Sequence, residues 1–296
     1  MPGLRQQLIT VLAPIVRVFP PWWKVRFYAR IVGDRFGKTG DSGIVKRRRV
    51  NPHQYEMELQ LDDPMERFAY FVGCYWGIDV TATVLTLLRR GNYFIDVGAN
   101  LGFLTLTASK AVGREGKVLA FEPLVAMADR LHQTLLNNAI DNVTVHQHAL
   151  GDVDGEAMLD LDDHSSKANL RHTEENGVKI KIVRGDHVVS DLPKETWVLA
   201  KLDVEGYELR VLKGFQSLIR RPKTGFLVEI TDQWLRDLGG SAEELFDLML
   251  GNGFKAYLPK LTFLSKLELR PISLTLAGRY QYDLVFLRPE DGWFSR

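Results

Sequence analysis

The sequence predicts an α/β domain in which a mostly parallel sheet of seven strands is covered by helices on both faces. Two observations lead to this prediction. From residue 92 onward, short apolar runs alternate with segments of helical spacing, as repeated βα units require. The last two runs follow each other with no helical pattern between them, so at least one of these strands should run antiparallel.

Each expected strand is an apolar run of strand length, bounded by glycine, proline or polar residues. The seven strands of the main sheet are expected at residues 93–97, 118–121, 143–147, 197–202, 226–230, 262–269 and 280–287. Two further runs, 157–161 and 178–182, alternate apolar and polar positions. This alternation predicts a half-buried β-hairpin inserted into the domain.

The segments between these strands have the apolar spacing of amphipathic helices. Helices are expected within residues 64–89, 102–112, 127–135, 211–219 and 241–249. In the last of them, Ser241 and Glu244 match a capping box ahead of the apolar positions.

The N-terminal part is expected to be separate. We predict a helical arm and connecting segment in residues 1–62, and the main domain in 63–296. The apolar stretch 8–19 is shorter than the roughly 20 residues that span a bilayer, and Pro14 interrupts it. Trp22 and Trp23 suit a membrane surface, although packing on the main domain or on a second copy of the chain is the simpler interpretation. We expect a cytoplasmic protein, peripheral to a membrane at most.

Composition excludes several functional classes. The 296 residues are 45% hydrophobic and 25% charged, as in ordinary globular proteins. The formal net charge of +1 gives no electrostatic reason to expect a nucleic acid partner. Cys74 is the only cysteine, which rules out an intramolecular disulfide and a cysteine zinc cluster.

A cofactor site is predicted where the first strand of the main domain meets its helix. Residues 94–102 read FIDVGANLG, so a buried strand runs into a glycine turn. Gly98 would let the chain bend and a ligand approach the backbone, next to the unpaired N–H groups of a helix N-terminus. Glu122 follows Gly102 by 20 residues, and its carboxylate could accept both hydroxyls of an adenosine ribose.

The turn does not match a dinucleotide site. A dinucleotide fingerprint starting at Gly98 needs glycine at positions 100 and 103, which hold Asn100 and Phe103. S-adenosylmethionine has no pyrophosphate to cradle, so it fits the turn better. A nicotinamide-dependent oxidoreductase remains one alternative, and a catalytically silent scaffold that keeps the cofactor pocket is another.

Four segments, in this order, resemble those of FkbM-type methyltransferases. They are residues 94–105, 121–123, 201–208 and 228–230. The resemblance covers roughly residues 70–290. It implies a Rossmann-like class I methyltransferase fold, S-adenosylmethionine as cofactor, and O-methylation of a hydroxyl on a sugar, glycan or secondary metabolite. The acceptor would be a small molecule or a glycan.

The resemblance also implies a set of cofactor-binding residues, with the turn after the third strand beside the adenine. These residues are Asp96, Gly98, Ala99, Asn100, Gly102, Glu122, Pro123, Ala149 and Leu150.

We expect the catalytic residues to include Asp203 and Glu205, which follow the fourth parallel strand. Glu229, at the end of the next strand, would be a third partner. One of these acids could have a raised pKa and act as a base, or they could bind a divalent metal ion. The alternative is that acids here only stabilise a helix N-terminus, which Glu208 fits best. Lys201 could pair with one of the acids. His164 and His172 are weaker candidates for a base in a polar loop.

Overall fold

The computed structural model describes residues 28, 45–50, 52–161, 168–169, 177–262, 266–273, 281–293 and 295. Two compact units make up the chain, residues 1–78 and 79–296. Most of the predicted N-terminal arm, and both His164 and His172, lie outside the described residues. No described helix is long and apolar enough to cross a membrane.

Unit 1 contains a β-hairpin followed by a helix. β1 (Val45–Val50) and β2 (Tyr55–Gln60) pair antiparallel, and α3 (Pro64–Val72) follows. Asp63 caps α3, because its Oδ1 accepts hydrogen bonds from the backbone N–H groups of Met65 and Glu66 at 2.8 and 3.0 Å. The segment expected as a connection thus forms a hairpin. The domain boundary at residue 63 stays a prediction.

The main domain combines helices and strands, which alternate from α4 to β5 and again, with paired helices, from α7 to β12. The helices are α4 (Ile78–Leu87), α5 (Phe103–Val112), α6 (Val125–Asn137), α7 (Gly185–Val189), α8 (Glu208–Gly214), α9 (Gln216–Arg220), α10 (Asp232–Asp237) and α11 (Ala242–Gly251), with a 3₁₀ turn at Pro289–Asp291. The strands are β3 (Tyr93–Val97), β4 (Lys117–Phe121), β5 (Val143–His146), β6 (Ala149–Gly151), β7 (Gly155–Leu161), β8 (Ala168–Asn169), β9 (Val178–Arg184), β10 (Val198–Leu202), β11 (Thr224–Ile230), β12 (Lys255–Leu261), β13 (Leu267–Pro271) and β14 (Tyr282–Leu287).

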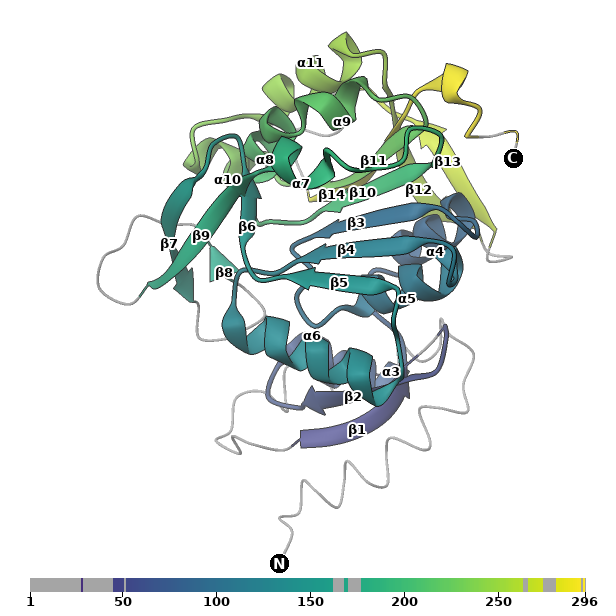
Figure 1. Ribbon diagram of the computed structural model, residues 1–296, viewed down its shortest axis with the longest axis vertical. Helices are drawn as coiled ribbons and strands as arrows, with labels where there is room; N and C mark the ends of the chain where they lie inside the picture. Colours follow the sequence, from purple (N-terminus) through teal and green to yellow (C-terminus); the bar gives the residue numbers. More distant parts are fainter. Residues whose placement is uncertain are drawn as a thin grey trace, which may run out of the picture. The chain divides into compact units, whose positions relative to one another are not determined.

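The central sheet has the order β13-β12-β14-β11-β10-β3-β4-β5, and Figure 1 shows β5, β4, β3 and β10 side by side. The five strands from β11 to β5 are parallel, whereas β14 runs antiparallel to both of its neighbours. The prediction of a mostly parallel sheet with an antiparallel end is confirmed. Chain order reverses between β3 and β10, the kind of switch point at which open α/β sheets bind ligands.

The prediction of seven strands is wrong for the described part of the chain, where the central sheet has eight. The strand that the sequence did not reveal is β12, which follows Gly253. Pro259 lies inside it and has no backbone N–H to donate to a ladder, so it conceals the strand pattern. The strand expected at 262–269 is the shorter β13, which pairs with β12.

Two predicted helices are each divided in two. The pattern at 64–89 gives α3 and α4, and the stripe at 211–219 gives α8 and α9. The second division follows Gly214, where an added Cβ would stand 1.9 Å from the carbonyl oxygen of Gly151 in β6. Close packing against β6 therefore ends α8 at a glycine.

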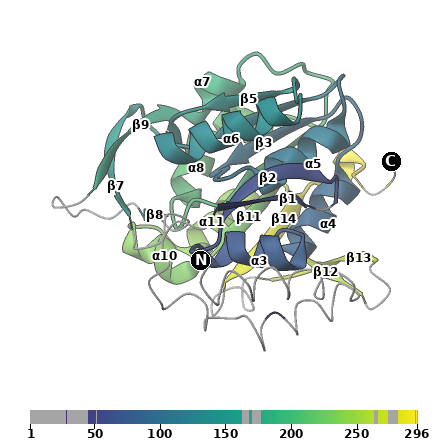
Figure 2. The ribbon, with the colours of Figure 1, turned by 90° about the horizontal axis from the view of Figure 1, so that it is seen from below.

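The predicted hairpin is confirmed as β7 and β9, which pair antiparallel with Ala157 opposite Ile180. β6 adds to β9 in parallel, and β8 adds to β7, so the insertion is a small second sheet. In the views of Figures 1 and 2, β7 and β9 lie to one side of the central sheet.

The two faces of the central sheet differ in chemistry. One face contributes every second residue of the strands to a large apolar core, for example Val97 of β3, Leu202 of β10 and Val228 of β11. Side chains of α8, α9, α10 and α11 complete that core. Because side chains alternate between faces, the residues between these core positions point to the other face. Asp96, Lys201 and Glu229 are among them.

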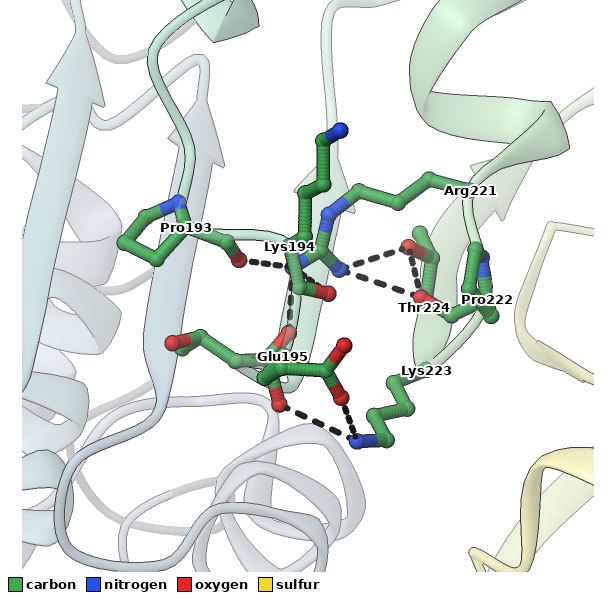
Figure 3. Close-up of polar contacts among 8 residues, drawn as sticks. Pro193, Lys194, Glu195, Arg221, Pro222, Lys223 and Thr224 are labelled. Carbon is green, nitrogen blue, oxygen red and sulfur yellow. Dashed lines mark hydrogen bonds and ion pairs between the residues drawn. The ribbon is translucent and has the colours of Figure 1, made fainter.

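At the amino edge of the sheet, two cationic side chains of the turn before β11 bind residues of the turn before β10. Nη2 of Arg221 donates to the carbonyl oxygens of Pro193 and Lys194 at 2.5 and 3.1 Å (Figure 3). Nζ of Lys223 contacts the Glu195 carboxylate at 2.7 Å. These contacts join the turns that precede β10 and β11. The charged residues described next lie at the opposite, carboxyl edge.

Candidate active site

The turn between β3 and α5 is held against the end of β10. Gly98 has a φ of +80°, and an added Cβ would stand 2.0 Å from the carbonyl oxygen of Asp203. The backbone N–H of Asp203 also donates to the carbonyl of Val97 at 3.1 Å. Glycine is therefore required at position 98 because β10 approaches it, rather than only because a ligand would. The predicted cofactor turn and the predicted catalytic acid are consequently in contact.

Glu122 anchors the other side of this turn. Its Oε2 accepts a hydrogen bond from the backbone N–H of Asn100 at 2.8 Å, and its Oε1 accepts one from Leu124 at 2.9 Å. The residue is 6% exposed. Burial raises the pKa of this carboxyl to about 7, although the two N–H groups oppose the shift. The carboxyl thus lies where the sequence predicted it, and it is already bonded to the turn.

Asp96 lies in β3 below the turn. Its Oδ2 accepts a hydrogen bond from the hydroxyl of Thr105 in α5 at 2.5 Å. Its Oδ1 is buried and has no hydrogen-bond partner among the described residues. Burial raises the pKa of Asp96, and the charge of Lys201 opposes this. A buried carboxylate oxygen without a donor is costly unless a ligand supplies one.

Lys201 and Asp203 form an ion pair at the end of β10. Nζ of Lys201 stands 2.8 Å from Oδ2 of Asp203, and the two side chains are 5% and 23% exposed. Burial alone would raise the pKa of Asp203, but the Lys201 ammonium and a hydrogen bond from Glu229 outweigh it and hold the pKa below its usual range. The expected pairing of Lys201 with an acid is confirmed, and Asp203 is the partner.

Glu229 is the neighbour of Asp203, one strand over in β11. Burial, and then the charge of Asp203, raise the pKa of Glu229 to about 10. At neutral pH, Glu229 therefore keeps its proton and shares it with the Asp203 carboxylate. The side-chain amide of Gln281 donates to Oε1 of Glu229. The acid with a raised pKa is thus Glu229, and it is poised as a donor rather than as a base.

Glu205 lies in a different setting. The chain turns at this residue, which has a φ of +53°. The extended geometry that would keep Asp203 and Glu205 on one side therefore ends there. Glu208 begins α8, and its Oε1 accepts hydrogen bonds from the backbone N–H groups of Val204 and Gly206 at 3.0 and 3.2 Å. Glu208 thus caps this turn, as its position at the helix N-terminus indicated.

The remaining predicted cofactor residues lie in the same turns. Ala99 donates its backbone N–H to the carbonyl of Phe121, and Gly102 has a φ of +83° at the N-cap of α5. Pro123 follows Glu122. Ala149 is partly exposed in β6, whereas Leu150 belongs to the apolar core.

Sequence reasoning did not find Asp283 and Gln281. Asp283 lies in β14 directly opposite Glu229. Burial, and then the charge of Asp203, raise its pKa to about 7. The only sequence signal was an acid at the start of an apolar strand. For a metal ion, the described residues contain no group of three or more His, Cys, Asp or Glu side chains suited to hold one.

Comparison with known proteins places these residues in a family. The model of the methyltransferase FkbM domain matches residues 96–256. The hexuronic acid methyltransferase AglP of Haloferax volcanii is 28% identical over 144 residues, which are 48% of this chain and 57% of that protein. Methyltransferase 1 of Beauveria bassiana is 25% identical over 148 residues, 43% of this chain and 59% of that protein. The chain thus spans less than three fifths of the length of these curated relatives.

Solved structures share a lower sequence identity with this chain. The crystal structure of methyltransferase FkbM from Methylobacillus flagellatus shares 18% identity at a TM-score of 0.44, covering 69% of this chain and 48% of that one. The family match itself covers more than half of the chain, from Asp96 through the ion pair and Glu229. The chain therefore belongs to the methyltransferase FkbM domain family, a family of S-adenosylmethionine-dependent methyltransferases with a Rossmann-like α/β fold.

Proposed function

We propose that this chain transfers a methyl group from S-adenosylmethionine to a hydroxyl of a sugar, glycan or secondary metabolite. One observation carries the proposal. The hydrogen-bonded pair Asp203–Glu229 adjoins the cofactor turn, because the backbone of Asp203 packs on Gly98. A polar pair whose oxygens have lone pairs free to accept hydrogen bonds suits a hydroxyl acceptor, which has an O–H to donate.

The residues present fit the cofactor. Each oxygen of Glu122 accepts one backbone N–H and has a second lone pair for a ribose hydroxyl. Oδ1 of Asp96 is buried and lacks a donor, which an N–H or water of the bound cofactor would supply. When bound, S-adenosylmethionine supplies a methyl group activated by a sulfonium. Ala99, Asn100, Gly102, Pro123, Ala149 and Leu150 stay predicted cofactor contacts.

The acceptor side is organised by Lys201. Its ammonium keeps Asp203 ionised, so Asp203 can accept a hydrogen bond from a hydroxyl that neighbours the methylated one, and so orient the acceptor. Glu229 donates its one proton to Asp203 and has lone pairs left to accept a hydrogen bond from a second hydroxyl of the same molecule. Sugars carry adjacent hydroxyls that can donate hydrogen bonds, which matches this arrangement. Glu205 stays a predicted contact of the acceptor.

The relatives support a sugar acceptor more than other classes, because one is a hexuronic acid methyltransferase. The family match disfavours a nicotinamide-dependent oxidoreductase. A silent scaffold is disfavoured by the Asp203–Glu229 pair beside the cofactor turn, which a protein that only holds the cofactor would not need.

The test is methyl transfer from radiolabelled S-adenosylmethionine to hexuronic acids, neutral sugars, polyketide alcohols and amines, with the product mapped by mass spectrometry. We expect an O-methylated sugar. Asp203→Asn should abolish transfer while leaving the affinity for S-adenosylhomocysteine, measured by calorimetry, nearly unchanged. Asp247→Asn, at an exposed site of α11, is the control. Transfer to amines alone would contradict the proposal, as would NAD binding without S-adenosylhomocysteine binding.

A further inference from the structure

The start of β14 lies at the same edge of the sheet as the ends of β10 and β11. β14 runs antiparallel to β11, and Asp283 is the register partner of Glu229. Directly opposed residues of an antiparallel pair share a face, with Cβ atoms about 4.5–5.5 Å apart. Asp283 therefore stands beside the Asp203–Glu229 pair. It lies beyond residue 256, outside the segment that matches the family.

The other two acids are poorly suited to take up a proton. The Asp203 carboxylate is bonded to the Lys201 ammonium and to Glu229, and both contacts favour its ionised form. Glu229 already holds a proton at neutral pH. Removal of the proton from a hydroxyl acceptor needs a base whose pKa is near the working pH. Neither member of the pair meets this requirement.

Asp283 has the properties of a base that Asp203 and Glu229 lack. Its side chain is half-buried, and it makes no hydrogen bond or ion pair with the described residues. The charged groups that act on it are Asp203 and Lys201 at the end of β10, Glu229 in β11, and Asp79 at the start of α4. Burial and the neighbouring acids raise its pKa to about 7, and Lys201 opposes the shift.

A second observation indicates that a ligand occupies this face. Asp96 is the register partner of Lys201, so the two side chains share the face that carries Glu229 and Asp283. Oδ1 of Asp96 is buried without a hydrogen-bond partner among the described residues, although Asp96 is only 1% exposed. A buried acceptor without a hydrogen-bond partner on this face of the sheet is expected where a bound ligand supplies the donor.

We propose that Asp283 is the general base that takes the proton from the acceptor hydroxyl. The inference rests on the proposed O-methylation. In the step, the hydroxyl O–H bond breaks and its proton passes to the Asp283 carboxylate. The oxygen lone pair forms the new bond to the methyl carbon, and the electron pair of the carbon–sulfur bond passes to sulfur. The products are the methyl ether and S-adenosylhomocysteine, and Asp283 then releases its proton to water.

The test compares Asp283→Asn with the parent, using the acceptor identified by the panel above. We expect kcat to fall by about 10²- to 10⁴-fold, with little change in the affinity for S-adenosylhomocysteine. The parent kcat should decrease as the pH falls through about 7, since Asp283 must be ionised. Asp283→Glu should recover part of the rate and the same pH dependence. Asp247→Asn should behave as the parent.

A ligand-free readout accompanies the kinetics. In carboxyl ¹³C NMR, the parent should show one more resonance that titrates near pH 7 than Asp283→Asn does, because Glu122 and Glu208 also titrate near pH 7 in both proteins. Urea denaturation at pH 8 shows whether the variant is folded. Parental kcat in Asp283→Asn, or no such loss of a resonance, would overturn the inference alone. A parent that methylates no hydroxyl would overturn the proposed function, and the role of Asp283 with it.

Discussion

Replacing Gly98 with alanine tests whether the cofactor turn depends on the approach of β10. The added Cβ would stand 2.0 Å from the Asp203 carbonyl oxygen, whereas ordinary contacts begin at 3.4 Å. The two backbones would have to separate by about 1.4 Å, the difference between these distances. That movement would break the hydrogen bond from Asp203 N to Val97 O and shift the Lys201 ion pair.

The expected loss can be divided into three contributions. The left-handed conformation costs a non-glycine residue about 1–2 kcal/mol. Overpacking adds about 1–3 kcal/mol, and the broken hydrogen bond adds about 1 kcal/mol. We therefore expect Gly98→Ala to lower the free energy of unfolding by about 3–6 kcal/mol, a large part of the stability of a typical domain.

Gly91→Ala is the matched control. Gly91 has a φ of +81°, almost the value at Gly98, but an added Cβ would meet no atom within 4 Å. Gly91→Ala should lower the free energy of unfolding by about 1–2 kcal/mol, from the backbone conformation alone. Urea denaturation of both variants, with the slope checked for constancy, measures the difference. Equal losses would refute the claim that the Asp203 carbonyl makes glycine necessary at position 98.

Three further predictions concern stability. The folded-state pKa of Glu122 is about 7, above its ordinary 4.5, so the parent should lose stability as the pH rises from about 5 to about 7. Glu122→Gln removes this loss, and urea denaturation should show its stability relative to the parent increasing by up to about 3 kcal/mol between pH 5 and pH 8, while S-adenosylhomocysteine binds more weakly. Lys201→Met leaves the Asp203 charge without its partner and should cost about 3–5 kcal/mol at pH 8, whereas Lys260→Met, on the exposed side of β12, should cost little in the same assay. Ser241→Ala removes the cap of α11, a hydrogen bond of 3.1 Å, and should lower the thermal midpoint by an amount equivalent to about 1 kcal/mol.

The parallel strands could be predicted because each is a short apolar run ending at a turn, and all five appear where the pattern put them. The cofactor turn could be predicted for the same reason. β12 could not, because Pro259 interrupts the strand signal. The division of the helical stripe at Gly214 depends on contact with β6, and no local pattern reports such a contact. Local chemistry is therefore readable from the sequence, whereas packing between distant segments is not.

In the candidate site too, local positions could be predicted from the sequence, whereas contacts between distant segments could not. Asp203 and Glu229 could be proposed from their positions at strand ends, but their partnership depends on the register between β10 and β11. Glu205 lies only two residues from Asp203 in the chain, but the turn at Glu205, with its φ of +53°, ends the extended geometry that would have put the two acids on one side.

Asp283 extends this argument. It is 80 residues from Asp203 in the chain, and only the antiparallel insertion of β14 beside β11 brings it to the carboxyl edge. A strand that runs with the parallel set would have placed its first residues at the opposite edge, beside Arg221 and Glu195. The direction of one strand thus decides whether this acid can take part in catalysis. The consequence is that the chemistry of the site depends on the end of the chain, beyond the segment that defines the family.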